Sequence, residues 1–261
     1  MKTKNLIDVK NLSVSFGNNI ILNKINLHLS KKESLVIIGK SGSGKSVLLK
    51  CLMGLLKPNL GSITIDDIDI VNSNRIDKEN ALKNIGVTFQ NGALFDSLTV
   101  WENITFKETR FFGFDKTAAK EKALSIIQNL ELDKNILELY PSELSGGMQK
   151  RVAIARAIVN NPEYLFCDEP NSGLDPKTAI VIDGLIQDIT DEFNMTTVVI
   201  THDMNSVIEI GENVLFIYQG KCWWQGDRRS IITADNPEIT NFVYASEFMR
   251  EIRANIQNSR N

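Results

Sequence analysis

Residues 39–46, GKSGSGKS, combine residue types and a spacing that suit the binding of a phosphate chain. They fit the pattern G-x-x-x-x-G-K-[ST], in which a glycine-rich turn lets several backbone N–H groups point at one anion. Lys45 adds a positive charge, the helix expected next adds the positive end of its dipole, and the Ser46 hydroxyl can ligate magnesium. We interpret this phosphate loop as a nucleotide site; a glycine- and serine-rich surface loop is the alternative.

The segments on either side of the phosphate loop favour the nucleotide site. Residues 34–38, SLVII, form a short apolar run rich in β-branched residues, which is typical of a buried parallel strand. Residues 47–55 repeat apolar side chains at helical spacing. A strand, the loop and a helix in this order are the expected surroundings of a phosphate-binding turn.

Polar side chains follow two further apolar runs. Residues 164–168, YLFCD, end at Asp168, and Glu169 comes next. A buried strand would place Asp168 beside the phosphate loop, where it can hold magnesium, and Glu169 could orient or deprotonate an attacking water. A polar strand cap is the alternative. Residues 196–201 end directly before His202, which should reach the strand ends where α/β folds place their chemistry.

A second anion-binding sequence lies at residues 144–151, LSGGMQKR. Ser145, Gly146 and Gly147 directly precede an expected helix, and such helix N-termini bind anions. One nucleotide has one triphosphate chain, which the phosphate loop already holds. The second sequence must therefore serve another nucleotide, or the far side of the same one across a dimer. This reasoning predicts a homodimer or a dimer with a close paralogue.

Apolar periodicity along the chain indicates an α/β fold. The short apolar runs predict a parallel sheet, and alternating segments in the first thirty residues and around a turn at Asp66-Asp67 predict a flanking antiparallel sheet. Helical spacing marks residues 116–130, the residues after Ser145, and a segment that ends near Phe193.

Composition excludes several classes of protein. The chain has 261 residues, a net charge of −3, and 43% hydrophobic and 23% charged residues, so it offers no basic field for nucleic acid. No apolar run reaches the roughly 18 residues that cross a bilayer, and the N-terminus has no signal-peptide core. We expect a cytoplasmic protein that can dock on a membrane. Cys51, Cys167 and Cys222 lie far apart in apolar stretches and predict free thiols.

Six motifs occur in one order: GKSGSGKS, Gln90 after an apolar run, LSGGMQ, YLFCDE, SGLD and His202. In this order and spacing the chain resembles the ATP-binding cassette (ABC) ATPases over roughly residues 6–234. The resemblance implies an α/β P-loop NTPase fold, with a RecA-like parallel-sheet core, an antiparallel β subdomain and an α-helical signature subdomain. It implies a nucleotide-binding domain at 5–235, with the helical subdomain at about 91–162, and a C-terminal helical extension at 236–261.

The resemblance also implies a role for each motif residue. Glu169 would be the general base, and His202 would sense the γ-phosphate. Lys45 would hold the β- and γ-phosphates, Gln90 would complete the catalytic set, and Asp175 would communicate across the dimer.

The cofactors implied by the resemblance are ATP and Mg²⁺. The metal would be served by Ser46, Gln90 and Asp168. ATP would be held by Phe16, stacked on adenine, and by Gly39, Lys40, Ser41, Gly42, Ser43, Gly44, Lys45, Ser46 and Val47. Across the dimer, Ser145, Gly146 and Gly147 of the opposite protomer would close over it.

Finer features resemble the ATPase subunit of MCE-type phospholipid transporters, the system that maintains lipid asymmetry in double-membraned bacteria. They are FQNGALFDSLTVWENITF, PSELSGGMQKRVAIARA, DEPNSGLDP and the C-terminal NPEITNFV. Met148 and Asn171 depart from the glutamine and threonine common in ABC ATPases, but neither is the catalytic acid, base or lysine. The resemblance implies a pair of membrane permeases, an MCE-type lipid-binding subunit in the periplasm, and a position on the cytoplasmic side of the inner membrane.

Two regions leave alternatives open. Residues 91–106 carry large apolar side chains without a clean period, which fits either the core of a helical lobe or an exposed groove, around Gln90 to Trp101, that receives a permease helix. Beyond Asn236, interrupted helical spacing fits either a helix packed on its own domain or a dimer-stabilising extension. Trp223 and Trp224 are consecutive on an expected strand, so their side chains should face opposite ways.

Taken with the resemblance, the sequence predicts an ATP-binding and ATP-hydrolysing subunit of a membrane transporter, with phospholipid as the cargo. An ABC ATPase of another small-solute importer, or of a cell-division-type membrane complex, is the alternative. A soluble ABC protein of DNA repair or translation is disfavoured, because one copy of each motif in 261 residues leaves no room for the insertions typical of those proteins.

Overall fold

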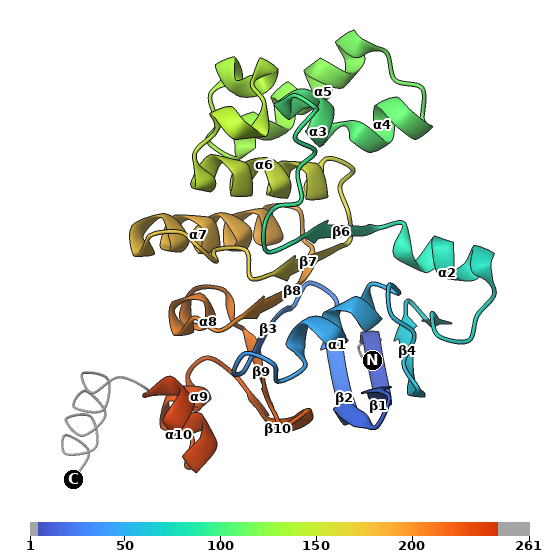
Figure 1. The fold of residues 1–261 in the computed structure, drawn as a ribbon, viewed down its shortest axis with the longest axis vertical. Helices are drawn as coiled ribbons and strands as arrows, with labels where there is room; N and C mark the ends of the chain where they lie inside the picture. Colours follow the sequence, from blue (N-terminus) through green and yellow to red (C-terminus); the bar gives the residue numbers. More distant parts are fainter. Residues whose placement is uncertain (1–4, 245–261) are drawn as a thin grey trace.

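A computed structural model of the protein describes residues 5–244 (Figure 1). Its centre is a six-stranded sheet in the order β10-β9-β3-β8-β7-β6. The parallel strands are β3 (Ser34–Ile38), β6 (Ile85–Thr88), β7 (Tyr164–Asp168), β8 (Thr196–Thr201) and β9 (Asn213–Tyr218), and β10 (Lys221–Gly226) pairs antiparallel with β9. The loops after β3, β7 and β8 therefore leave the same edge of the sheet.

A four-stranded antiparallel sheet in the order β2-β1-β4-β5 flanks this core, as the alternating segments predict. Its strands are β1 (Asn5–Phe16), β2 (Asn19–Ser30), β4 (Leu60–Ile65) and β5 (Ile68–Asp69). The predicted turn joins β4 to β5: Asp66 and Asp67 both have positive φ, of 48° and 66°, which aspartate tolerates better than most residues.

Each face of the central sheet belongs to its own hydrophobic core. Leu35 and Ile37 of β3 face a core shared with the antiparallel sheet and α1 (Lys45–Leu52). Val36 and Ile38 face the other core, which α6 (Gly146–Ile158), α7 (Pro176–Glu192), α8 (Met204–Ile210) and α9 (Ser230–Thr233) complete. Burial on both faces explains why these strands are continuous apolar runs in the sequence. Cys51 and Cys167 are buried, Cys222 is partly buried, and all three are free thiols.

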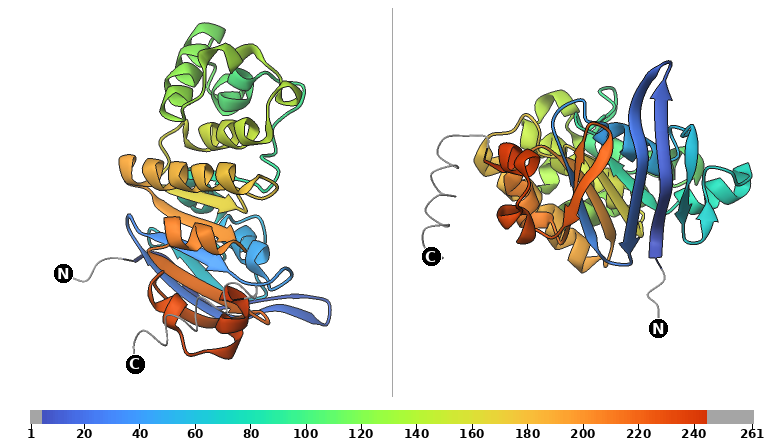
Figure 2. Two further views of the ribbon diagram at one scale, coloured as in Figure 1. Left: turned by 90° about the vertical axis from the view of Figure 1, so that its left-hand side faces the viewer. Right: turned by 90° about the horizontal axis from the view of Figure 1, so that it is seen from below.

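A helical region lies at one end of the molecule, and the last helices lie at the opposite end (Figure 2). The helical region contains α3 (Val100–Ile104), α4 (Phe106–Phe111), α5 (Lys116–Asn129), two 3₁₀ turns (Lys134–Glu138 and Pro141–Glu143) and α6. A further helix, α2 (Arg75–Leu82), precedes β6.

Residues 91–106 are divided between the core and the surface. Val100 and Trp101 are buried in the helical core, whereas the Phe95 side chain is 43% exposed. Asn103, which is fully buried, donates through its side-chain amide to the carbonyls of Phe95, Leu98 and Thr99 and so fixes the loop before α3.

The first turns of the C-terminal extension pack on their own domain. In α10 (Pro237–Val243), Ile239 and Val243 are buried in the same core as α7 and α8, and the Phe242 ring lies 5.4 Å from that of Phe216. The apolar residues Met249, Ile252 and Ile256 of the predicted extension lie outside the described residues.

The two tryptophans face opposite ways, as strand geometry predicts. Trp224 packs against the helical core, whereas Trp223 is 42% exposed and its indole N–H donates to Asn236 at the start of α10, at 3.3 Å. Within residues 5–244, no helix is long and apolar enough to cross a bilayer.

Candidate functional site

The phosphate loop leaves β3 and enters α1 in a conformation that requires glycine. Gly39 and Gly44 have positive φ, and a Cβ at Gly39 would lie 2.3 Å from the carbonyl oxygen of Ile217. A Cβ at Gly44 would lie 2.6 Å from the Leu22 side chain on the antiparallel sheet. The loop is therefore pressed between both sheets, and its Ser43 hydroxyl is buried without a hydrogen-bond partner. An oxygen-rich ligand such as a phosphate would satisfy such a donor.

Lys45, the first residue of α1, is 5% exposed and lies inside the loop. Its ammonium group donates to the carbonyl oxygens of Gly39 at 2.8 Å and Lys40 at 3.2 Å. Burial lowers the pKa of Lys45, while Glu169 and Asp168 nearby act in the opposite direction. A desolvated cation with only carbonyl partners is well placed to attract a polyanion.

Ser46 and Asp168 face each other across the strand ends. The Ser46 hydroxyl donates to a carboxylate oxygen of Asp168 at 3.2 Å. Burial raises the pKa of Asp168, and the bond from Ser46 partly offsets that effect. One hydroxyl and one carboxylate suit Mg²⁺, which keeps several waters and shares substrate phosphates. Residues 5–244 contain no cluster of three His, Cys, Asp or Glu side chains fit for a metal.

Three predicted catalytic residues meet at Glu169. The Gln90 amide donates to one Glu169 carboxylate oxygen at 3.2 Å, and the other oxygen lies 3.3 Å from the His202 Nδ1. The same Gln90 amide lies 3.2 Å from the Ser172 hydroxyl. Glu169 itself has φ of 47°, a left-handed conformation that is uncommon for a non-glycine residue. Strained backbone of this kind is concentrated at active sites, where the surrounding structure holds it.

A lysine to which the sequence analysis gave no role supports this arrangement. Lys150 on α6 is 9% exposed, and its ammonium group donates to the backbone carbonyl of Gln90. Burial lowers the pKa of Lys150, and Glu169 acts against that effect. The helix that begins at the second anion-binding sequence is thus joined to the glutamine beside Glu169. A lysine on an amphipathic helix is expected to face solvent. The sequence pattern therefore did not predict the buried position of Lys150.

The second anion-binding sequence lies apart from the phosphate loop. Ser145 caps α6, with its hydroxyl accepting from the Met148 N–H at 3.3 Å, and both Ser145 and Gly146 are exposed. A Cβ at Gly146 would lie 3.4 Å from the Leu174 side chain, and a Cβ at Gly147 would lie 2.8 Å from the Thr178 side chain in the first turn of α7. None of the hydrogen bonds within residues 5–244 joins this sequence to the phosphate loop. Phe16 likewise stands exposed at the tip of the β1–β2 hairpin.

Comparison with known proteins identifies the family of the chain. The family model described as "ABC transporter" matches residues 22–172. The chain belongs to the ABC transporter family. It is an ATPase subunit with the predicted fold: a parallel core, an antiparallel β sheet and a helical region.

Two curated relatives of this ABC subunit carry transport names. The probable ribonucleotide transport ATP-binding protein mkl of Mycobacterium leprae is 35% identical over 237 residues, covering 91% of this chain and 68% of the relative. The arginine transport ATP-binding protein ArtM of Bacillus subtilis is 41% identical over 218 residues, covering 82% and 88%. These relatives support the transport class and differ in the solute that their names give.

A solved structure matches the fold closely. The dimeric post-hydrolysis state of the ATP-binding cassette MJ0796 bound to ADP and Pi has a TM-score of 0.75 and 31% identity, and the match covers 85% of this chain and 99% of that one. That cassette is a dimer, and its bound products are those of ATP hydrolysis.

Proposed function

We propose that this ABC ATPase works as a homodimer that holds two ATP molecules between its protomers. The observation that carries the proposal is the distribution of the two anion-binding sequences. The phosphate loop lies with Asp168, Glu169 and His202, whereas Ser145 and Gly146 lie exposed, and neither they nor Gly147 make a hydrogen bond to that loop. A symmetric dimer brings each exposed sequence onto the ATP of the other protomer. The dimeric MJ0796 cassette supports this arrangement.

In the proposed site each residue has a task in ATP binding or in hydrolysis. The backbone of residues 39–46 and Lys45 hold the phosphates, and Phe16 stacks on adenine. Bound Mg²⁺, held by Ser46, Asp168 and Gln90, would neutralise charge on the phosphates. Glu169 accepts a proton from the attacking water, and Gln90 and His202 fix the two carboxylate oxygens that do so. Asp175, which caps α7 beside the partner-facing sequence, links the two protomers.

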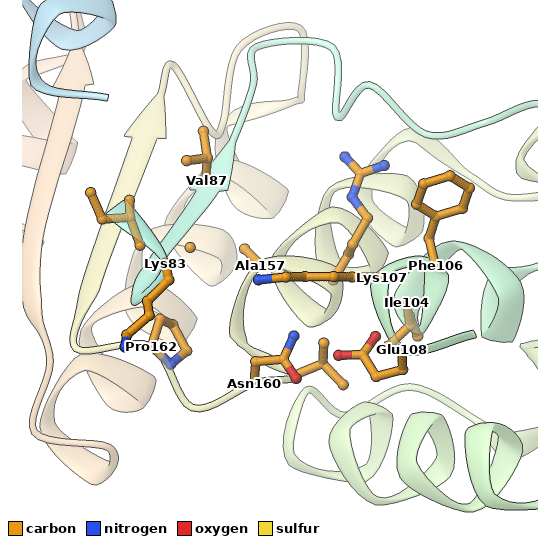
Figure 3. A pocket seen from close by; sticks show the side chains of 13 residues that line it. Lys83, Val87, Ile104, Phe106, Lys107, Glu108, Ala157, Asn160 and Pro162 are labelled. Atoms are coloured by element: carbon orange, nitrogen blue, oxygen red, sulfur yellow. The ribbon is translucent and has the colours of Figure 1, made fainter. Parts of the chain in front are cut away.

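We propose that a membrane permease docks beside Gln90. A pocket of about 230 Å³ lies between β6, α4 and the end of α6, with Ile104, Phe106, Lys107 and Glu108 facing Ala157 and Asn160 (Figure 3). The predicted docking segment, residues 90–101, does not line this pocket; residues on either side of it in the sequence do.

Two contacts join this pocket to the predicted docking segment. The exposed Phe95 ring lies 4.6 Å from the Phe106 ring in the pocket wall. Arg156, also in the wall, donates to the carbonyls of Gly92 and Ala93, two and three residues after Gln90. A helix seated on Phe95 and the pocket would therefore act on Gln90 and, through it, on Glu169.

We propose phospholipid as the cargo, with an MCE-type lipid-binding subunit in the same complex on the inner membrane. Support comes from the stretches FQNGALFDSLTVWENITF, PSELSGGMQKRVAIARA and DEPNSGLDP, which resemble the ATPases of that system. A second candidate is the import of a small solute such as an amino acid, which the name of ArtM favours. Cargo specificity resides mainly in the other subunits, so the partner decides between the two.

Copurification tests the proposed permease partner and the proposed phospholipid cargo. Tagged Glu169→Gln protein, loaded with ATP, is recovered from gently solubilised native membranes, and retained proteins and lipids are identified by mass spectrometry. We expect a permease, an MCE-domain subunit and bound phospholipid. A permease of an amino acid importer would overturn the lipid proposal and leave the ATPase standing. Recovery of no membrane protein would overturn the transporter proposal.

Two variants test the docking surface in the same experiment. Phe95→Asp should lose the permease but keep ATP-dependent dimerisation, because the change lies outside the nucleotide site. Ile76→Asp, at an exposed apolar residue on α2, should retain the permease. Equal retention by the two variants would overturn the proposed docking surface.

A further inference from the structure

A buried carboxylate on α7 bonds to two segments of the active site. Asp183 is fully buried, and one of its oxygens accepts from the Asn171 amide at 3.0 Å and from the Ser206 hydroxyl at 2.8 Å. Asn171 and Ser206 are buried too, and they also contact each other at 2.9 Å. The second Asp183 oxygen has no hydrogen-bond partner. These three side chains form a closed polar cluster inside an otherwise apolar core.

The cluster joins the two segments that carry the proposed hydrolytic residues. Asn171 lies two residues after Glu169 and directly before Ser172, whose hydroxyl bonds to Gln90. Ser206 lies in the first turn of α8, four residues after His202. Asn171 is also the position at which this chain departs from the common threonine, and its amide supplies a donor that reaches Asp183.

The charges around Asp183 oppose its ionisation. The pKa of Asp183 is raised to about 6: burial raises it most, and Asp203 and Glu209 on the α8 side add to the rise, while the bonds from Ser206 and Asn171 lower it. An apolar residue would fill this place on α7 at lower cost, because a buried charge loses its hydration.

We propose that Asp183 is a positioning residue for ATP hydrolysis, which holds the segment that carries Glu169 against the helix that follows His202. The ionised carboxylate accepts charge-assisted hydrogen bonds, which are shorter and stronger than neutral ones. Protonation replaces the two charge-assisted bonds by weaker neutral ones, so the alignment of Glu169 with His202 is held less tightly while the fold stays intact. The inference rests on the ATPase activity and is independent of the cargo.

The test compares Asp183→Asn with wild type in the full chain, by steady-state ATPase assays from pH 5 to pH 9. Asparagine keeps the shape and can accept both bonds but never ionises. We expect kcat at pH 8 to fall about tenfold, with the KM for ATP unchanged because the phosphate loop is not touched. Wild-type kcat should rise with an inflection near pH 6, where Asp183 titrates, and the variant should lack that inflection.

A matched control separates positioning from general packing. Thr190, also buried on α7, shares a hydrogen bond of 2.7 Å with Thr197 and has no contact with the site. Thr190→Val should lower thermal stability and leave both kcat and the pH profile as in wild type. Wild-type kcat and a retained inflection in folded Asp183→Asn protein would overturn the proposal.

Ser206→Ala supplies an independent variant in case Asp183→Asn does not fold. It removes one donor and should lower kcat at pH 8 in the same direction, again with KM unchanged. In the double variant the two effects should be far from additive, because both act through one cluster. Full additivity, or no effect of Ser206→Ala on kcat, would also overturn the proposal.

Discussion

Glu169 is the residue on which the proposed chemistry depends, because Gln90 and His202 contact its two carboxylate oxygens at 3.2 and 3.3 Å. Glu169→Gln keeps the side-chain size but removes the proton acceptor. We expect turnover to fall by at least about 100-fold, the lower range for losing a general base, while ATP still binds.

The ATP-bound dimer of Glu169→Gln should therefore accumulate. Light scattering after size exclusion with ATP and Mg²⁺ would detect twice the monomer mass. Glu121→Gln, on the exposed face of α5, is the control and should turn over ATP as wild type does. Wild-type turnover by Glu169→Gln would remove Glu169 from the role of base.

Asp183 also predicts a pH dependence of stability. Its folded pKa of about 6 lies above the ordinary 3.8, so ionisation is resisted in the folded state. The contribution of Asp183 to the free energy of unfolding is therefore fully present below about pH 4 and is lost as the pH rises through about 6. Relative to Asp183→Asn, the wild-type free energy of unfolding should fall by about 3 kcal/mol between pH 4 and pH 7. Urea unfolding across this range measures the difference, and a constant difference would contradict the prediction.

Helix α10 belongs to the domain core, as the burial of Ile239 and Val243 shows. Ile239→Ala should lower the free energy of unfolding by about 2–4 kcal/mol, the usual cost of deleting three buried carbons. Ile76→Ala, at a residue that is 71% exposed on α2, should change it by less than about 0.5 kcal/mol. If urea unfolding gives the two variants equal stability, α10 does not pack on the domain as described.

Elements with local signals were the easiest to predict from sequence. The phosphate loop, the strands of residues 34–38 and 164–168, and the Asp66-Asp67 turn depend on residues that are adjacent in the chain, and all of them form. The stretch 91–106 was harder, because Val100 and Phe95 are equally apolar and only tertiary packing buries the first and exposes the second.

Long-range polar contacts of the site could not be predicted. Lys150 and Asp183 lie on amphipathic helices, where a charged residue usually faces water. Their partners, the Gln90 carbonyl and the Asn171 amide, are 60 and 12 residues away in the chain. Composition and periodicity do not predict which charged residues are buried in the folded protein. The residues predicted for the site were those that the motif patterns specify.

In the proposed mechanism each ATP site is completed by a second protomer, and a pair of variants tests this directly. Lys45→Ala disables the phosphate loop of its own protomer. Gly146→Asp places a negative charge where the partner's phosphates would bind; a Cβ there finds space, 3.4 Å from Leu174, and an acidic residue suits a helix N-terminus. Each variant alone should lose ATPase activity while staying folded.

In the mixed dimer of these variants, both defects fall on one composite site and the other site is intact. An equal mixture should therefore recover up to about a quarter of wild-type activity, since half the dimers are mixed and each has one of two sites. Lys45→Ala mixed with Glu169→Gln is the control: Glu169 lies on the same protomer as the phosphate loop, so each site keeps one defect and activity should stay absent. Recovery in the control, or none in the test mixture, would mean that the two anion-binding sequences do not act across protomers.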